Sequence, residues 1–331
     1  MLTILYLLII FFLFFILGKS ADSLIFNVKK IAEKLKINKY IIGIIFGILT
    51  TTPELFVGIN AIKNNIGSIS IGNLFGGIIL LFTLLLGIDL ILNKKIKTDG
   101  NIKNILPSFL FILLGIITGL KGYFNFYDGI FFIFLYFTIV FYINKTNNIN
   151  EYELNILNKK NDFSNDLKNI FLKKNVKKEI VKEILISIIS IITLLITSDI
   201  IIDLSIKILS QFNISKFFIG LIMFSIGTNL PELTVVLRAF KNKDSELSLS
   251  HLIGSAMANI FILSILSLFN NFKITINFSY ILLLITTIIS SILIILFYKT
   301  NKEFSRNEGY SLVLIYIIFI IAQFLYEVAW A

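Results

Sequence analysis

The sequence predicts an all-α membrane protein with ten transmembrane helices, arranged as two five-helix repeats of inverted topology. Three observations support this class. The 331-residue chain is 56% hydrophobic with a mean hydropathy of +0.90, more than a soluble core requires. Apolar runs of about 18 or more residues recur along its whole length. The two halves match at a fixed offset, and an odd number of spans in each half inverts the second copy.

Ten spans are expected, with short gaps everywhere except in the middle of the chain. Their predicted bounds are 2–28, 38–62, 67–92, 104–120, 125–144, 181–209, 215–238, 248–270, 276–298 and 309–329. The first run lacks a basic leading segment and a small-residue cleavage site, so we interpret it as a span and not as a removed signal. The chain therefore divides into a first repeat (1–144), a cytoplasmic linker loop (145–180) and a second repeat (181–331).

The distribution of basic residues predicts the orientation. Of the 30 lysines and arginines, 24 lie in the odd-numbered gaps and only five in the even-numbered gaps. Cytoplasmic loops are enriched in basic residues, so the odd gaps are expected inside and both termini outside, in an integral protein of the cell membrane. The net charge of +10 is thereby explained by topology, which argues against nucleic-acid binding. The absence of cysteine excludes disulfides and thiolate metal sites.

The internal repeat is clearest when Glu54 is set on Glu232. The same offset matches Leu55 with Leu233, Val57 with Val235, Ala61 with Ala239, Lys63 with Lys241, Asn64 with Asn242, Ser70 with Ser248, and Gly76 with Gly254. Upstream, a one-residue shift matches Asp22 with Asp199 and Gly43 with Gly220. The first half therefore lacks one residue between Gly43 and Thr50.

Each half carries a Pro-Glu pair in the middle of an apolar run, at residues 53–54 and 231–232. An ionised carboxylate at the bilayer centre costs about 3 kcal/mol, so it needs a partner, a proton or a cation. The proline frees a carbonyl about one turn earlier, and hydroxyls or an amide occupy the same turn. One such pair could be a kink whose carboxylate faces water or a lysine. Two matched copies, using two of the three prolines, predict two halves of one cation site.

These motifs resemble the sodium/calcium exchanger family, within the calcium/cation antiporter superfamily. The family carries Gly-Thr-Ser-x-Pro-Glu on spans two and seven, and Gly-Ser-x-x-x-Asn or Asp on spans three and eight. The second half fits with Gly227, Thr228, Asn229, Pro231 and Glu232, followed by Gly254, Ser255 and Asn259. The resemblance covers both repeats, at about 16–92 and 194–270.

The resemblance implies alternating-access exchange of Ca²⁺ against Na⁺ through four central cation positions. It implies a ligand set of side chains and carbonyl groups around the two glutamates. The implied ligands are Glu54, Glu232, Thr50, Thr51, Thr228, Asn229, Ser255 and Asn259, with the carbonyls of Gly47 and Ser225. The expected partners are Ca²⁺, Na⁺ and the lipid bilayer, with no cofactor and no nucleic acid; the oligomeric state is left open.

The first half departs from the family pattern. Leu49 replaces the motif glycine, and Thr51 the serine. On span three, Gly77 stands where serine is expected, and Leu81 where the family has Asn or Asp. Two ligand side chains are therefore missing. The two glutamates should keep a Ca²⁺-like central position, while one or more Na⁺ positions weaken.

Other polar residues near the motifs have two interpretations. Asp22 and Asp199 could bind ions, but their paired placement favours a structural or gating role. His251, the only histidine, matches Asn73 and favours a helix-end or packing role over pH sensing. Gly72, Gly76, Gly77 and Gly254 most simply allow close helix approach.

The leading hypothesis is a cation antiporter in which Glu54 and Glu232 share one dehydrated ion and spans one and six slide past the bundle. A first alternative keeps the fold but couples transport to protons or carries another cation. A second is a degenerate membrane protein that does not transport. An enzyme is disfavoured because the sequence offers no convincing nucleophile–base pair, histidine pair or cysteine.

Overall fold

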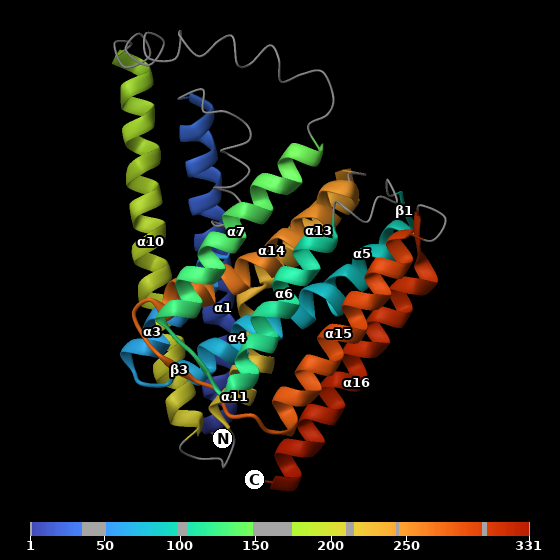
Figure 1. Cartoon of the computed structure of the whole chain (residues 1–331). Coiled ribbons are helices and arrows are strands. Elements are labelled where there is room, and N and C mark those ends of the chain that lie inside the picture. Colours follow the sequence, from blue (N-terminus) through green and yellow to red (C-terminus); the bar gives the residue numbers. More distant parts are fainter. Residues whose placement is uncertain are drawn as a thin grey trace.

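A computed structural model of the chain describes residues 2–34, 51–97, 105–147, 174–209, 215–242, 245–299 and 303–330 (Figure 1). The first half contains α1 (Leu2–Lys34), α3 (Thr52–Lys63), α4 (Gly67–Ile79), η1 (Leu80–Leu85), α5 (Leu86–Asn93), β1 (Lys95–Lys97), α6 (Leu106–Thr118), η3 (Gly119–Lys121), β2 (Tyr123–Phe124) and α7 (Phe126–Asn147). The second contains α10 (Lys174–Leu209), α11 (Lys216–Ile219), η4 (Gly220–Phe224), α12 (Ser225–Thr228), α13 (Leu230–Asn242), α14 (Ser245–Ser267), β3 (Phe272–Lys273), α15 (Phe278–Lys299), β4 (Glu303–Ser305) and α16 (Arg306–Trp330). The predicted helical class is confirmed.

Eight described segments are long and apolar enough to cross a membrane. They are Leu5–Val28, Gly67–Asn93, Phe126–Ile143, Ile180–Ile208, Lys216–Leu237, Ser248–Ser267, Phe278–Lys299 and Arg306–Ala329. A shorter apolar helix, Leu106–Lys121, coincides with the predicted fourth span. The predicted second span, 38–62, is described only in its second part, as α3, because residues 38–50 lie outside the described residues. The count of ten therefore stays a prediction.

Four short strands depart from the all-α expectation. β1 pairs antiparallel with β4, and β2 pairs antiparallel with β3, so each two-stranded sheet joins one half of the chain to the other. β1 lies at the upper right of Figure 1 and β3 at the lower left, at opposite ends of the bundle. Because Lys95 of β1 matches Lys273 of β3 at the repeat offset, the two sheets are related by the internal repeat. Strands of two or three residues carry no detectable periodicity, which explains why the sequence did not predict them.

The helices pack around two separate groups of buried apolar side chains. The larger group joins α4, η1, α5, α6 and α7 to α14, α15 and α16, with Phe75, Phe109 and Phe261 among its members. The smaller group joins α1, α3 and α10 around residues such as Leu17 and Leu194. Many large apolar side chains on the outer faces are exposed, including Phe11 and Phe134, as expected for surfaces that meet lipid.

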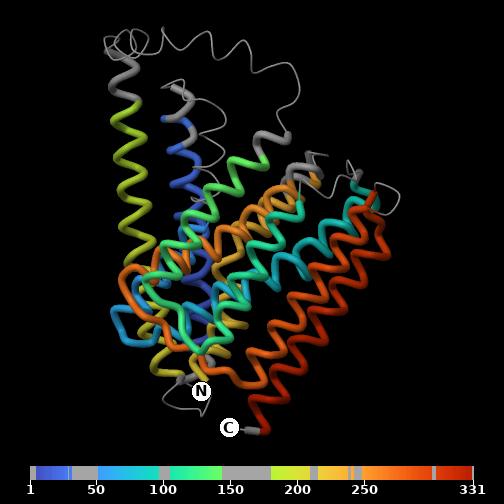
Figure 2. Tube along the Cα trace, viewed as in Figure 1, coloured from blue at the N-terminus to red at the C-terminus, as the bar shows by residue number. Residues whose placement is uncertain are grey.

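The two long helices α1 and α10 lie side by side and extend beyond the rest of the bundle at the top of Figure 1. The ends marked N and C lie at the same end of the molecule (Figure 2). An even number of membrane crossings produces this arrangement. The segments Gly67–Asn93 and Ser248–Ser267, which contain α4 and α14, are the most buried of the eight apolar segments, and each half of the chain contributes one of them.

Candidate cation-binding site

The predicted helix break of the second half is present, because Asn229 (φ −89°, ψ 14°) separates α12 from α13. In the first half α3 begins after Thr51 (φ −95°, ψ 18°), and residues 35–50 before it lie outside the described residues, so a break there stays a prediction. Pro53 and Pro231 follow two residues later, in the first turn of a helix, where a missing N–H costs no internal hydrogen bond. In both halves the first backbone bond of the new helix measures 3.2 Å. The helices that carry the Pro-Glu pairs therefore start with the same local structure in both repeats.

Glu54 lies in the first turn of α3, and Glu232 lies in the first turn of α13. Both residues are fully buried. The N-terminal end of a helix carries a partial positive charge that favours a nearby carboxylate. Each carboxyl group thus lies at the N-terminal end of a helix, where the backbone offsets part of the free-energy cost of burying it.

The two carboxyl groups lie close enough to repel each other, and Asp22 of α1 adds a weaker repulsion on Glu232. Within the described part of the chain, none of the four glutamate oxygens has a hydrogen-bond partner. No cluster of three or more acidic or histidine side chains occurs among these residues either. A cation between the glutamates would therefore complete its shell with neutral oxygens, as Ca²⁺ commonly does.

Thr228 lies beside the first glutamate. Its hydroxyl donates to Oδ1 of Asn73 at 3.0 Å and also lies within hydrogen-bonding reach of the Glu54 carboxyl group. Asn73 is a fully buried residue of α4, and its Nδ2 has no partner among the described residues. Asn73 lies outside the predicted ligand set, although its hydrogen bond joins it to a member of that set. A usable signal was its spacing, because an amide four residues before Gly77 lies on the same face of an otherwise apolar helix.

The amides of the second half occupy the space where the first half lacks a side chain. A Cβ added at Gly77 would lie 2.7 Å from Asn259 Nδ2 and 3.0 Å from Asn229 Nδ2. Asn229 Nδ2 also donates to the carbonyl of Ser225 at 2.9 Å. Both polar atoms of the Asn259 side chain are buried and lack partners among the described residues. The space beside Gly77, where a serine side chain would lie, is thus filled by amide nitrogens from the opposite repeat.

The remaining predicted site residues fall into three groups. Ser255 lies one turn before Asn259 on α14 and is buried, with its Oγ unpartnered among the described residues. Thr51 is buried directly before α3. Thr50 and Gly47 lie outside the described residues. Leu81 is fully buried within η1, so the position of the absent family ligand is apolar.

Repeat-matched polar residues outside the ligand set have different surroundings. Asp199 of α10 forms an ion pair with Lys63 of α3 at 3.6 Å, while Asp22 interacts electrostatically with Glu232. His251 lies in the second turn of α14, partly buried, and its Nε2 has no partner among the described residues. The matched sequence positions therefore do not have matched contacts.

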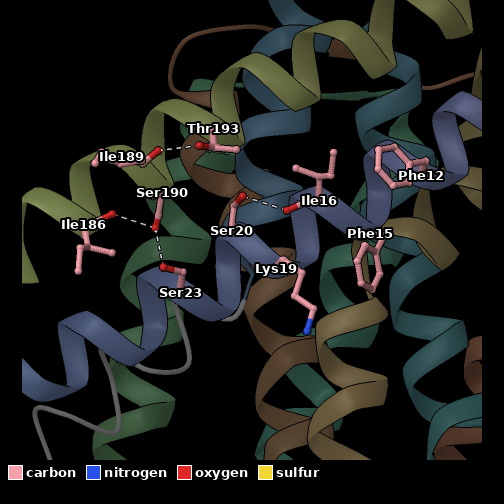
Figure 3. Close-up of a pocket in the computed structure, with 10 residues that line it drawn as sticks. All are labelled: Phe12, Phe15, Ile16, Lys19, Ser20, Ser23, Ile186, Ile189, Ser190 and Thr193. Carbon is pink, nitrogen blue, oxygen red and sulfur yellow. Dashed lines mark hydrogen bonds between the residues drawn. The ribbon is translucent and has the colours of Figure 1, made fainter.

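A pocket of about 330 Å³ lies between α1 and α10 (Figure 3). Its apolar wall includes Phe12 and Ile189, and Lys19 lies along one side. Ser190 donates to Ser23 Oγ at 3.0 Å across the helix pair. The pocket is a feature of the contact between the two long helices and contains no member of the predicted ligand set.

Comparison with known proteins agrees with this geometry. The profile of the family described as sodium/calcium exchanger protein matches residues 5–144 and 182–325. An uncharacterized membrane protein of Methanocaldococcus jannaschii, MJ0091, is 29% identical over 301 residues, covering 90% of this chain and 91% of that protein. The sodium/calcium exchanger MaX1 of Methanosarcina acetivorans is 32% identical over 107 residues, covering 32% of this chain and 30% of that protein.

Solved structures of the sodium-calcium exchanger NCX_Mj share the fold. The form soaked with 2.5 mM Na⁺ and 1 mM Sr²⁺ has a TM-score of 0.62 and 26% identity, covering 97% of this chain and 98% of that one. The form soaked with 10 mM Na⁺ and 10 mM Sr²⁺ has a TM-score of 0.63 and 27% identity, covering 96% and 98%. Since the family match spans both repeats and the structural match nearly the whole chain, this integral membrane protein belongs to the sodium/calcium exchanger protein family.

Proposed function

We propose that this protein is a secondary-active antiporter that exchanges Ca²⁺ against Na⁺, with Glu54 and Glu232 sharing the central cation. The observation that carries the proposal is the pair of fully buried, mutually repelling carboxyl groups whose oxygens have no partner among the described residues. Two uncompensated carboxylates in an apolar interior are strongly unfavourable. A dehydrated divalent cation removes the repulsion and supplies the missing ligands, and Na⁺ ions that bind the same oxygens compete with it.

The neutral ligands in this proposal come largely from the second repeat. Thr228, Asn229, Ser255 and Asn259 supply hydroxyl and amide oxygens, with the Ser225 carbonyl one turn before the break. Thr50, Thr51 and the Gly47 carbonyl would act for the first repeat. Oxygen ligands of this kind suit a hard cation, and the transported ions are the only ligands required, with no further cofactor.

Alternating access would come from movement of α1 and α10 past the bundle. Gly18 of α1 packs against Pro231 in ordinary van der Waals contact, with 3.6 Å between an added Cβ and the proline ring. Because Asp22 lies one turn further along and interacts with Glu232, a shift of α1 changes the electrostatic environment of the site. The excess of basic residues in the odd gaps supports an orientation with both termini outside the cell membrane and the linker loop 145–180, between the two repeats, in the cytoplasm.

The direct test is Ca²⁺ uptake into Na⁺-loaded proteoliposomes, driven by an outward Na⁺ gradient. The wild type is expected to accumulate Ca²⁺, whereas Glu54→Gln and Glu232→Gln should each weaken Ca²⁺ binding by about 100-fold or more, because each removes one of two anionic ligands. Glu303→Gln is the matched control, since Glu303 pairs with Lys95 near the surface, and its uptake should be retained. Unchanged uptake in both glutamate variants would refute the shared site.

Proton coupling is a second candidate, favoured by the absence of oxygen ligands at Gly77 and Leu81. In this version one glutamate carries a proton during the return step in place of Na⁺. Ca²⁺ uptake that follows a pH gradient in Na⁺-free vesicles would select it over Na⁺ coupling. Uptake that requires Na⁺ and ignores the pH gradient would exclude it.

A further inference from the structure

The hydroxyl of Thr228 is bonded differently from most hydroxyls in the spans. Serine and threonine side chains of this protein commonly donate to the carbonyl four residues earlier, as Thr83 does to Ile79 and Ser225 does to Leu221. Thr228 instead donates across the repeat interface to Asn73 Oδ1. The carbonyl four residues before Thr228 belongs to Phe224. This residue ends the π-helical segment η4, where the α-helical bonding pattern is interrupted.

This bond decides which part of the hydroxyl faces the carboxylate. A threonine hydroxyl has one proton and two lone pairs, and it binds a cation only through a lone pair. Asn73 Oδ1 and the Glu54 carboxyl group both lie within reach of the Thr228 hydroxyl, so they compete for its single proton. When Asn73 accepts the proton, the lone pairs of the threonine oxygen are left free to bind a cation beside Glu54. Asn229 Nδ2 approaches the same oxygen only at 3.5 Å, while its shorter bond goes to Ser225.

We propose that Asn73 is a positioning residue for transport: it binds the proton of Thr228 and so presents the threonine oxygen to the cation beside Glu54. The proposal rests on the proposed function and adds a first-repeat residue outside the predicted ligand set. Without the acceptor, the Thr228 proton would turn toward Glu54 and compete with the cation for the carboxylate.

The backbone around Asn73 holds it rigidly in place. Gly72 and Gly220 allow α4 to pack directly on the α11–η4 segment, because a Cβ at either position would lie 2.2 Å from a carbonyl oxygen of the opposing helix. A Cβ at Gly220 would also lie 3.0 Å from the backbone nitrogen of Asn73. Backbone contact fixes the distance between the two helices, so Asn73 is preorganised to meet Thr228.

The test is a double-mutant cycle on the full-length protein, with Ca²⁺ affinity measured by isothermal titration in Na⁺-free buffer. Asn73→Leu keeps the side-chain size but removes the acceptor, and Thr228→Val removes the hydroxyl. Each is expected to weaken Ca²⁺ binding by about fivefold to tenfold. In the double variant the loss should stay close to that of Thr228→Val alone, because Asn73 acts only through the hydroxyl.

Two further variants separate positioning from general stability. Asn73→Asp retains an acceptor oxygen and should hold Ca²⁺ affinity at or above the wild-type value. Asn60→Leu is the matched control, since Asn60 is also a buried amide that bonds another helix, through Ser198 Oγ at 2.8 Å. It should lower the melting temperature about as much as Asn73→Leu and leave Ca²⁺ affinity unchanged.

The outcomes distinguish this inference from the proposed function. If the wild type binds Ca²⁺ but the losses in the cycle add, or if Asn73→Asp binds as poorly as Asn73→Leu, the positioning role is wrong and the exchange proposal stands. If the wild type binds no Ca²⁺ at all, the exchange proposal fails and the role assigned to Asn73 fails with it.

Discussion

Gly77 shows how a single missing side chain changes the composition of the site. Where the family carries a serine oxygen, this chain has no side chain, and the amides of Asn229 and Asn259 come within 3.0 Å of where a Cβ would lie. The atoms in question are the amide nitrogens, which donate hydrogen bonds, so they fill the space of the absent side chain without replacing its oxygen. The two amides require a glycine at this position, because a side chain would collide with them. The same glycine leaves the first repeat without the serine oxygen.

Gly77→Ala is expected to weaken Ca²⁺ binding by about tenfold, or 1.4 kcal/mol, with only a small change in melting temperature. The added Cβ meets the flexible ends of two side chains, which can shift without unfolding the helix but no longer occupy their positions in the site. Calcium titration combined with thermal denaturation of the purified protein measures both effects. Gly254→Ala is the matched control, because nothing lies within 4 Å of a Cβ at that position. Equal affinities for both alanine variants would contradict this account.

At the scale of elements, the π-helical segment η4 accounts for the offset between the two halves. The second half has one residue more than the first between Gly220 and Thr228, and a π-helical turn accommodates one extra residue within an α-helical span. The matching residues 43–47 of the first half lie outside the described residues. The π-helical segment ends at Phe224, the residue whose carbonyl would accept the hydroxyl of Thr228 in a regular α-helix.

Close backbone packing between α4 and α11–η4 gives a stability prediction. Gly72→Ala should lower the free energy of unfolding by about 3 kcal/mol, because its Cβ would lie 2.2 Å from the Phe217 carbonyl oxygen and backbone atoms cannot move aside as side chains do. The fraction of protein that stays monodisperse in detergent after heating reports the change. Gly18→Ala is the comparison, since its nearest neighbour would be 3.6 Å away. Equal heat resistance of the two variants would show that the α4 contact is not tight.

At the scale of the whole molecule, the hydrogen bonds of α1 and α10 suggest which parts move together. The smaller apolar group packs these two helices against α3 and against Ile69 of α4 and Phe224 of η4, while the larger group joins most of the other helices in one bundle. The Ser23–Ser190 bond links α1 to α10, whereas Asn60 bonds Ser198 and links α10 to the site helix α3. If α1 and α10 slide as a pair, the first link is kept during transport and the second must break.

Disulfide cross-linking tests this directly, because the chain contains no native cysteine. The pair Ser23→Cys with Ser190→Cys, once oxidised, should retain most Na⁺-driven Ca²⁺ uptake. The pair Asn60→Cys with Ser198→Cys should lose most of it on oxidation and regain it on reduction, since the bond fixes α10 to α3. The uncross-linked double variants serve as controls. Full uptake in the oxidised Asn60–Ser198 protein would rule out sliding of α10 past the site.

The sequence by itself determined the membrane class, the internal repeat, and the two Pro-Glu pairs with their helix starts. These features depend on local chemistry: apolar run length, the missing N–H of proline, and the cost of a carboxylate in an apolar span. Each is readable from neighbouring residues. The family resemblance followed from the same motifs and was confirmed by the matches over both repeats.

Only the tertiary structure decided which polar groups of the two repeats meet each other. The bond from Thr228 to Asn73 joins residues 155 positions apart, and the amides beside Gly77 come from the opposite repeat. The two short sheets that join the halves were likewise invisible in the sequence. A sequence motif indicates which ligands each helix carries. The contacts between oppositely oriented helices depend on how closely their backbones approach, and glycines at the helix contacts set that distance.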